Sequence, residues 1–481
     1  MDMILTKITQ GVDFKKKEII PYVNAVALMG LFTFLFLNAE YLFVDFLSGI
    51  VLENKAVLAQ NYVLGVSAVG FVLYPLFNRF CKDRMKAAGS VIIGLLSVLC
   101  IVLICLGTTY TAIFAAGLVL FLLLGLFGSG VFYVSMRMMK TDRYLARTVG
   151  ISYALGILLQ FVNNNLVHSE TAQAVIISVF LLLLVGLLIK NDRDFCKQDE
   201  ARADAPAKDN MNTEKIGKGT VVGALLMLLV ILMTCIFSTL DNAVTLVHAG
   251  KTTDIGQAPR ILLALSGLAA GFIFDIKNRK YMGIIMYCVM VLSIICIAVL
   301  RLGGPFLMGL VVFYLSAGFF AVFFTSGFME ISRHMKVPEL WAGMGRAVNN
   351  ITAAIIANPV LVLLSSDGSL AFIVLVLALI VAVSVVAFVY TFQKKTFTEQ
   401  LVTDAAETVS DKEKLYKFSE VFSFTDREAE VFACLVGTED SIQTIAEGMY
   451  VSRRTLERYI SSIYEKTGVK SRVGLLNLYK K

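Results

Sequence analysis

The stretch Gly271-Phe-Ile-Phe-Asp275-Ile-Lys-Asn-Arg279-Lys280 is a short charged segment between two long apolar runs of the chain. It follows the eighth apolar run, and a related stretch, Tyr74-Pro-Leu-Phe-Asn78-Arg79-Phe-Cys-Lys82, follows the second. A second pair of similar stretches, Gly117-Leu-Val-Leu-Phe121 and Gly309-Leu-Val-Val-Phe313, falls in the fourth and tenth runs. The sequence therefore predicts two halves in which similar segments recur in the same order.

The composition of the chain identifies lipid as its main solvent. Apolar residue types make up 57% of the 481 residues, and charged types only 16%; the mean hydropathy is +0.77. A soluble domain carries about a quarter charged residues and could not cover this much apolar surface in water. The net charge of +7 does not distinguish a basic cytoplasmic face from a basic DNA-binding segment.

Apolar runs of about 20 residues, the length that crosses a membrane as a helix, occur twelve times. In the first half they centre on 21–44, 57–77, 88–107, 111–136, 147–167 and 172–189. In the second half they centre on 219–240, 256–274, 281–300, 305–329, 340–364 and 369–392. We therefore expect an all-α bundle of twelve transmembrane helices in two six-helix repeats, 1–190 and 219–392, joined by a cytoplasmic linker at 191–218.

Lysine and arginine collect in alternate loops, and this asymmetry predicts the orientation of the bundle. The loops on the side of the N-terminus contain, besides the central linker, Arg79, Lys82, Arg84, Lys86, Arg137, Lys140, Arg143, Arg147, Lys277, Arg279, Lys280, Lys394 and Lys395. The other loops offer little beyond Lys55, Lys251, Arg260 and Arg301. We expect a multi-pass protein of the bacterial cytoplasmic membrane with both termini in the cytoplasm. The first apolar run lacks an A-x-A-like exit and is expected to stay as an uncleaved helix.

With its repeated halves, the membrane region resembles the major facilitator superfamily. Segment 271–280 is similar to the loop signature of that family, in which a glycine, three residues and an aspartate precede a basic cluster. The resemblance implies a gating loop that includes Asn78, Asp275 and Arg279. In the first-half copy Asn78 replaces the aspartate and Cys81 the usual glycine, which puts transport in doubt and favours sensing. The simpler alternative is that any cytoplasmic loop of a twelve-span protein is basic.

Polar side chains inside the predicted spans are expensive to bury and are candidates for a function. Most of them fall toward the outer half of the bundle, and we predict that they line a ligand pocket open to the outside. The candidates are Asn38, Glu40, Asn61, Asn163, Asn164, Asp241, Asn242, Arg260, Arg346, Asn349 and Asn350, with Gln60 beside them. The alternative for each residue is that it holds two helices together or lies in the interface near water.

The sequence offers no constellation typical of an enzyme. Its eight cysteines form no C-x-x-C pair and are interpreted as small apolar packing residues. Its three histidines lie far apart, and none stands at zinc-ligand spacing from a cysteine. We therefore expect no enzymatic activity, no cofactor and no metal site.

A soluble module follows the last apolar run. Residues 393–420 are polar and of mixed charge and are interpreted as a linker of helical character, and 421–481 form a small domain. Thr425 and Glu428 have the spacing of a capping box at a helix start. A second helix is predicted near 441–448, a third after the N-cap Ser452, and a last one at 471–479. The complete fold class is therefore all-α, a transmembrane bundle plus a small four-helix domain.

The order of motifs in this module resembles the LuxR/GerE-type helix-turn-helix. The matching stretches are Thr425-x-Arg427-Glu428-x-Glu430-Val431, Ile445-Ala446-Glu447, Ser452-x-x-Thr455-Leu456 and Ile463-x-x-Lys466-x-Gly468-Val469-x-Ser471-Arg472. Two departures stand out: the turn after Gly437 is about two residues longer than usual, and Tyr459 stands where the family commonly has histidine. The core pattern is untouched, so we expect a DNA-binding domain.

The third helix of such a domain enters the major groove of double-stranded DNA. The resemblance implies that Glu457, Arg458 and Ser461 face the bases. It also implies that Arg453, Arg454, Thr455 and Lys466 engage phosphates. The alternative is a solvated helix face without a ligand. One module offers few contacts, so we expect two copies to dimerise on paired half-sites of the DNA.

Together these features predict a membrane-embedded transcription regulator in which the facilitator-like domain senses a small molecule and controls the DNA-binding domain. The runner-up is a secondary transporter with a regulatory DNA-binding tail. In a third interpretation the membrane domain, in contact with lipid, is only an anchor.

Overall fold

A computed structural model describes residues 16–480 apart from 82, 140, 201–212, 250–257, 302–305, 366–368 and 439. The described residues form helices and short connections without a strand, so the expected all-α fold is confirmed. Contacts divide the chain into two compact units, Met1–Lys395 and Thr396–Lys481. Each unit is described by itself.

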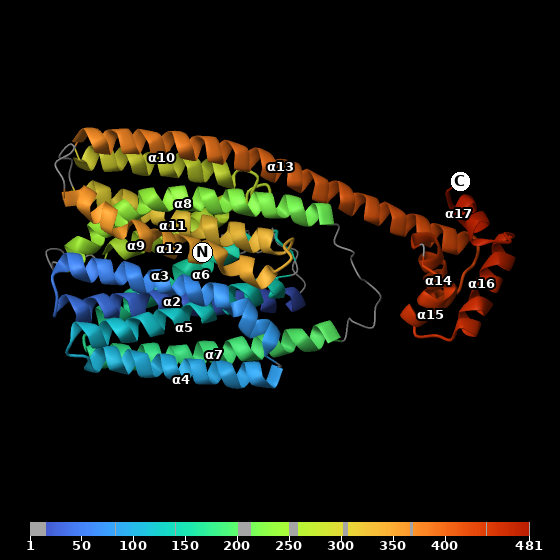
Figure 1. Ribbon diagram of the computed structural model, residues 1–481, viewed down its shortest axis with the longest axis horizontal. Helices are drawn as coiled ribbons and strands as arrows, with labels where there is room; N and C mark the ends of the chain where they lie inside the picture. Colours follow the sequence, from blue (N-terminus) through green and yellow to red (C-terminus); the bar gives the residue numbers. More distant parts are fainter. Residues whose placement is uncertain are drawn as a thin grey trace. The chain divides into compact units, whose positions relative to one another are not determined.

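The helices of the first unit run side by side as a bundle (Figure 1). Those of the first half are α2 (Lys16–Ser48), α3 (Glu53–Phe80), α4 (Asp83–Leu106), α5 (Tyr110–Met138), α6 (Leu145–Leu166) and α7 (Glu170–Glu200). Those of the second half are α8 (Thr213–Ala249), α9 (Ala258–Phe274), α10 (Met282–Arg301), α11 (Phe306–Ser332), α12 (Pro338–Ser365) and α13 (Ser369–Val421). Each helix begins within a few residues of a predicted span or overlaps it.

Nine of the described helices are long and apolar enough to cross a membrane. Two shorter apolar segments, Arg260–Phe274 and Met282–Ile297, lie in α9 and α10. In hydrocarbon every backbone N–H and C=O must be satisfied within the segment, and a helix does this by itself. The apolar helices therefore identify a membrane protein.

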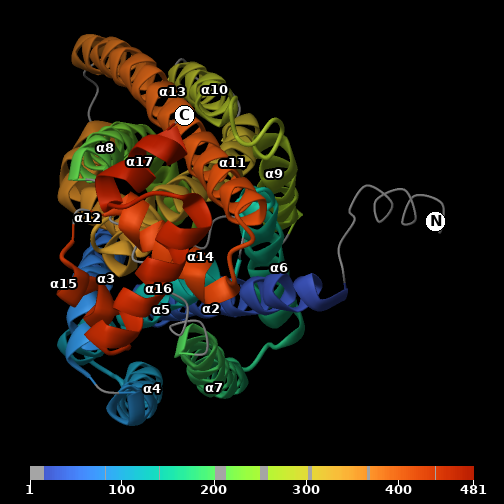
Figure 2. The same ribbon diagram turned by 90° about the vertical axis from the view of Figure 1, so that its right-hand side faces the viewer.

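The two halves contact each other through a small set of helices. Across the halves α3 packs on α12 and α6 packs on α9. Viewed end-on, α4 and α7 lie together on one side of the bundle (Figure 2). On the opposite side α10 and α13 adjoin, where the Tyr287 and Ser384 hydroxyls hydrogen-bond at 2.8 Å.

Glycines allow the central helices to approach closely. A Cβ atom on Gly70 of α3 would lie 2.0 Å from the Leu122 carbonyl oxygen of α5, and one on Gly125 would lie 2.1 Å from the Ser67 carbonyl oxygen. Small residues at facing positions are a general means of bringing membrane helices into van der Waals contact. A side chain at either glycine would push α3 and α5 apart.

Helices extend into both of the predicted linkers, 191–218 and 393–420. The predicted linker at 191–218 begins as the end of α7 and ends as the start of α8, and its central part, 201–212, lies outside the described residues. The predicted linker at 393–420 is helical throughout, because α13 continues to Val421. Residues 393–420 contain neither glycine nor proline and are rich in good helix formers, so nothing in the segment interrupts the helix.

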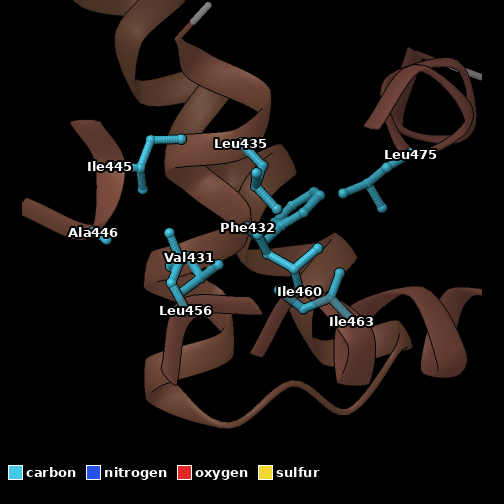
Figure 3. Close-up of a cluster of buried hydrophobic side chains, with 9 residues drawn as sticks. All are labelled: Val431, Phe432, Leu435, Ile445, Ala446, Leu456, Ile460, Ile463 and Leu475. Carbon is cyan, nitrogen blue, oxygen red and sulfur yellow. The ribbon is translucent and has the colours of Figure 1, made fainter. Parts of the chain in front are cut away.

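The second unit contains the end of α13 and helices α14 (Asp426–Gly437), α15 (Ile442–Gly448), α16 (Arg453–Thr467) and α17 (Arg472–Lys480). Side chains from all four short helices meet in one apolar core (Figure 3). Its members are Val431, Phe432, Leu435, Ile445, Ala446, Leu456, Ile460, Ile463 and Leu475. The Phe418 ring, near the end of α13, stacks on Phe432 with centroids 4.7 Å apart. The last turns of α13 thus belong to the core of this unit.

The predicted helix starts of this unit are confirmed. The Thr425 side chain accepts a hydrogen bond from the Glu428 N–H, and the Glu428 carboxylate accepts one from the Thr425 N–H, which completes the capping box. The Ser441 and Ser452 side chains cap α15 and α16 by accepting hydrogen bonds from the Thr444 and Thr455 N–H groups. These caps satisfy N–H groups that the first turn of a helix leaves without a partner.

Candidate functional sites

Helix α16 has one face in the core and one face in solvent. Leu456, Ile460 and Ile463 are buried against α14 and α15. Residues three and four apart share a face of a helix, so the positions between them point outward. Glu465 and Lys466 are exposed near the end of the helix, and five exposed side chains precede them: Arg453, Arg454, Glu457, Arg458 and Ser461. All five were predicted to contact DNA, and their exposed side is the side that a groove could receive.

Hydrogen bonds within α16 orient part of this exposed face. The Arg453 Nε lies 2.9 Å from the Glu457 Oε1, which forms an ion pair one turn apart. The Ser461 hydroxyl donates to the Glu457 carbonyl oxygen at 2.9 Å. The Thr455 hydroxyl is 2.7 Å from that of Ser452, so it belongs to the helix start and is half-buried. The face carries three arginines and one glutamate, an excess of positive charge suited to a polyanion.

Lys466 lies in a different environment from the other predicted DNA contacts. Its Nζ is 2.6 Å from the Glu428 Oε2 and donates to the Ser423 carbonyl oxygen at 2.9 Å. The Ser462 hydroxyl donates to the other Glu428 oxygen at 2.6 Å. Burial alone would raise the pKa of Glu428, but the hydrogen bonds from Lys466, Ser462 and Thr425 outweigh it and lower the pKa to about 2. Lys466 therefore joins α16 to the start of α14.

Arg472 organises the long turn after Gly437, a role that the sequence motifs did not assign to it. Its guanidinium donates to three backbone carbonyl oxygens: that of Leu435 at 2.9 Å, that of Asp440 at 2.6 Å and that of Thr438. These acceptors lie at and beyond the end of α14, where helix carbonyls lack intrahelical partners. The only hint of this role in the sequence was that Ser471-Arg472 belongs to the matching motif.

A cavity of about 230 Å³ lies in the membrane unit. It is lined by polar residues of α2, α3, α8, α9 and α12 and by aromatic residues of α2, α6, α8 and α11. Six predicted ligand-binding residues line it: Glu40, Asp241, Arg260, Arg346, Asn349 and Asn350. Gln60 also lines it, and so do aromatic residues that sequence analysis did not select because apolar side chains are common in every span: Phe36, Tyr41, Tyr153, Phe237, Phe313, Tyr314, Phe320 and Phe324.

The remaining predicted pocket residues lie outside the lining. The Asn163 side-chain amide of α6 donates to the Asn38 side-chain oxygen of α2 at 3.1 Å. Asn61 of α3 donates to Asn242 of α8 at 2.9 Å. Such amide pairs hold helices together, which is the alternative considered for these positions. The Asn164 side chain has buried nitrogen and oxygen atoms without a hydrogen-bond partner in the described part of the chain.

The loop after α9 reaches across to the first half. The buried Asp275 carboxylate accepts hydrogen bonds from the Ala146 N–H at 3.1 Å and the Arg147 N–H at 2.8 Å, at the start of α6. Burial raises the pKa of Asp275, although these hydrogen bonds and Arg279 act in the opposite direction. Lys277, Asn278 and Arg279 adopt left-handed backbone angles with φ of 48°, 53° and 61°. This tight loop turns the Arg279 guanidinium inward, 3.1 Å from Asp275.

The last turn of α3 makes the corresponding contact with different residues. The Arg79 Nε lies 2.7 Å from the Glu339 Oε1, in the first turn of α12. The acidic group that the predicted pattern misses at Asn78 is thus supplied by Glu339 of the other half. Asn78 itself is half-buried. An acidic side chain is favourable at the start of a helix, and each contact has one there: Asp275 at the start of α6 and Glu339 at the start of α12.

An ion-pair cluster connects the loop after α9 with three further elements. Arg333 lies 2.7 Å from Asp142 in the loop before α6, which joins the two halves. Glu330 of α11 lies 3.2 Å from Arg279 and 2.7 Å from the Lys394 Nζ of α13. We call Asp142, Asp275, Arg279, Glu330, Arg333 and Lys394 the ion-pair cluster. Asp275 follows the C-terminal end of α9, whereas the cavity residue Arg260 lies in the first turn of that helix.

Comparisons with known proteins agree with both units. Residues 422–478 match the family described as bacterial regulatory proteins, luxR family. No curated protein matches the chain.

Among solved structures, an auto inhibited POT family peptide transporter has a TM-score of 0.51 at 9% identity, covering 79% of this chain and 96% of that one. The major facilitator superfamily proton:xylose symporter XylE, bound to 6-bromo-6-deoxy-D-glucose, has a TM-score of 0.51 at 14% identity, covering 80% of this chain and 96% of that one. At these identities the likeness concerns the fold. The chain therefore carries a luxR-type DNA-binding domain at residues 422–478, fused to a membrane domain with a major facilitator superfamily-like transporter fold.

Proposed function

We propose that this protein is a ligand-responsive transcription regulator held in the bacterial cytoplasmic membrane. A small molecule occupies the cavity of the membrane unit, and its binding changes the DNA binding of the luxR-type domain. Neither fold is that of an enzyme family, and the proposal assigns no catalysis, cofactor or metal to the chain.

The observation that carries the proposal is the double attachment of α13. Lys394 of this helix pairs with Glu330 in the ion-pair cluster, and Phe418 of the same helix stacks in the core of the DNA-binding domain. The cluster also joins the two halves through Arg333 and Asp142. A ligand that favours one arrangement of the halves would change these ion pairs, and α13 would transmit the change. Such a ligand acts only through different affinities for the two arrangements.

We also propose a membrane topology for the first unit and a dimeric assembly for the C-terminal domain. Helices α2–α13 cross the membrane twelve times and leave both termini in the cytoplasm, in agreement with the loop charge asymmetry. The lipid bilayer surrounds the apolar helices. The C-terminal domain dimerises on paired half-sites of double-stranded DNA, because a single module has few contacts with which to specify a sequence.

A reporter experiment tests the proposal. Immunoprecipitation of the DNA bound by the full chain identifies an operator, and a reporter gene behind it measures output as metabolites are added. We expect one class of metabolite to change output. The charge reversals Asp241→Lys and Arg346→Glu should abolish this change while the protein still occupies the operator.

The control is Asp45→Lys, a reversal in α2 at a residue outside the cavity lining. A response that survives both cavity reversals contradicts the role of the cavity. A response that survives replacement of the twelve helices by one unrelated transmembrane helix contradicts sensing by the membrane unit altogether.

A secondary transporter with a regulatory DNA-binding tail is the second candidate. The transporter-like fold favours it, and so does the Arg79–Glu339 contact, which restores a charged loop contact in the first half. Substrate uptake into proteoliposomes distinguishes the two candidates. Accumulation above the equilibrium level in the presence of an ion gradient would favour transport, whereas binding without accumulation favours sensing.

A further inference from the structure

The cavity contains two groups of each charge. Glu40 of α2 and Asp241 of α8 are carboxylates, and Arg260 of α9 and Arg346 of α12 are guanidiniums, so their formal charges sum to zero. None of the four forms an ion pair with an N–O distance within 4 Å among the residues that the structure describes. Charges inside a membrane domain are costly unless they are paired or solvated. The four charged groups therefore lack close partners of opposite charge among the described residues, and a charged ligand could supply them.

Arg346 lines the cavity and forms no ion pair within 4 Å with any described residue. Its Cζ atom lies 5.4 Å from the centroid of the Phe36 ring and 5.5 Å from that of the Phe324 ring. Its Nε has no hydrogen-bond partner in the described part of the chain. Aromatic faces stabilise the cation but leave its N–H edge unused. A planar N–H edge of this kind accommodates a carboxylate through two parallel hydrogen bonds.

The lining contains two carboxylates, Glu40 and Asp241. Glu40 accepts a hydrogen bond from the Gln60 amide at 2.5 Å, whereas Asp241 has no hydrogen bond or ion pair with any described residue. Glu40 and Asp241 repel each other electrostatically. Arg260, which acts electrostatically on both carboxylates, is engaged by the Gln160 side-chain oxygen and lies 5.8 Å from the Tyr41 ring centroid. A cation between the two carboxylates would relieve their repulsion.

Size and lining limit the rest of the ligand. The volume of about 230 Å³ is below the range of about 300–1,000 Å³ that drug-sized molecules occupy. Phe237, Phe313 and Phe320 supply apolar wall, together with Phe36 and Phe324. A ligand must therefore be small, with a compact apolar body beside its charged groups.

From these contacts we infer that the cavity binds a small zwitterion, an amino acid with an aromatic or branched aliphatic side chain, with its carboxylate on Arg346 and its ammonium between Asp241 and Glu40. This inference rests on the proposed ligand response of the same cavity, and it specifies the chemical class of the ligand. Both charges of such a ligand meet a group that has no other close partner of opposite sign, so a molecule lacking either charge leaves one buried group unpaired.

Two matched sets of probes test the inference on the full chain in lipid nanodiscs. The first set is phenylalanine, phenethylamine and 3-phenylpropionate, and the second is leucine, isopentylamine and 4-methylpentanoate. Within each set the apolar body is constant and one charge is removed. Isothermal titration calorimetry should show that one or both amino acids bind about tenfold or more tightly than either of their singly charged analogues.

Variants assign each charge to its partner. In Arg346→Gln the preference for the amino acid over the amine should fall to about threefold or less, while the preference over the acid persists. In Asp241→Asn the reverse should hold. The matched controls Arg84→Gln and Asp45→Asn, both outside the cavity lining, should behave as wild type. Retained thermal unfolding temperatures of the two cavity variants show that they are folded.

Two results overturn the inference: neither amino acid binds the wild type, or each analogue binds as tightly as its parent. The reporter experiment separates this failure from that of the proposed function. If another class of molecule drives a response that depends on Asp241 and Arg346, sensing stands and the zwitterion is wrong. If the amino acids bind as described but operator output never changes, the zwitterion stands and sensing fails.

Discussion

The Lys394 Nζ of α13 lies 2.7 Å from the Glu330 Oε2 of α11, and the other oxygen of Glu330 lies 3.2 Å from Arg279. One carboxylate thus connects the loop after α9 with the helix that continues into the second unit. Both side chains of the Lys394–Glu330 pair are less than one-fifth exposed. A part-buried pair of this kind is sensitive to the loss of either partner.

We expect Lys394→Ala to separate ligand binding from DNA output. The variant removes the contact of α13 with the ion-pair cluster but leaves the cavity and the DNA-binding surface intact. Coupling between sites is typically about 1–3 kcal/mol, or about 5–150-fold in affinity, so the reporter response should fall by at least about fivefold. Calorimetry should show unchanged affinity for the ligand. The control is Lys414→Ala, an exposed lysine on the same helix, and an undiminished response in Lys394→Ala would contradict the coupling role.

The pKa of Glu428 predicts the acid sensitivity of the C-terminal domain. Because the folded-state pKa is lowered to about 2 from an ordinary value of 4.5, the ionised carboxylate stabilises the fold above pH 4.5. This contribution is lost as the pH falls from 4.5 toward 2, since the unfolded chain binds the proton first. The urea midpoint of the fragment 396–481 should decline across this window. Glu428→Gln should reduce the decline, whereas Glu430→Gln, at an exposed neighbour, should not.

Lys466 and Arg458 should differ in their effects on DNA binding. Arg458 is exposed, and its removal should leave the fold unchanged and relax base discrimination by about 1–3 kcal/mol. Lys466→Ala breaks the bond to Glu428 and should lower stability by about 1.5–3 kcal/mol, the usual range for a charged hydrogen bond. It should therefore weaken binding to all sequences alike. Titrations with operator and scrambled DNA, and melting curves of both variants, check the distinction; identical binding patterns would refute it.

Arg472 should be a stability determinant of the long turn after α14. Its guanidinium satisfies the carbonyl oxygens of Leu435, Thr438 and Asp440, and lysine cannot reproduce that fork of donors. We expect both Arg472→Ala and Arg472→Lys to lower the free energy of unfolding of the domain, the alanine variant by about 1.5–3 kcal/mol. The matched change Arg454→Ala, on the exposed face of α16, should have little effect on unfolding. Equal stability of Arg472→Lys and wild type would show that a single donor suffices.

The sequence by itself determined the elements of this protein. Apolar runs of membrane length, caps at Thr425, Ser441 and Ser452, and the luxR-type motif depend on residues close together in the chain. Local hydrogen bonding and hydrophobic periodicity act over such distances, so the helices, the helix-turn-helix and the side of α16 that faces outward could be predicted.

Only the tertiary structure decided which polar residues share a site. Asn38 and Asp241 lie in similar apolar surroundings in the sequence, yet Asn38 pairs with Asn163 and Asp241 lines the cavity. The same holds for Lys466, which bonds Glu428, a residue 38 positions earlier in the chain. Contacts between distant segments depend on how helices pack, and no periodicity encodes them. The loop at 271–280 illustrates both contributions. Asp275 and Arg279 could be selected from their spacing in the sequence, but their partners Ala146 and Glu330 are set by the fold.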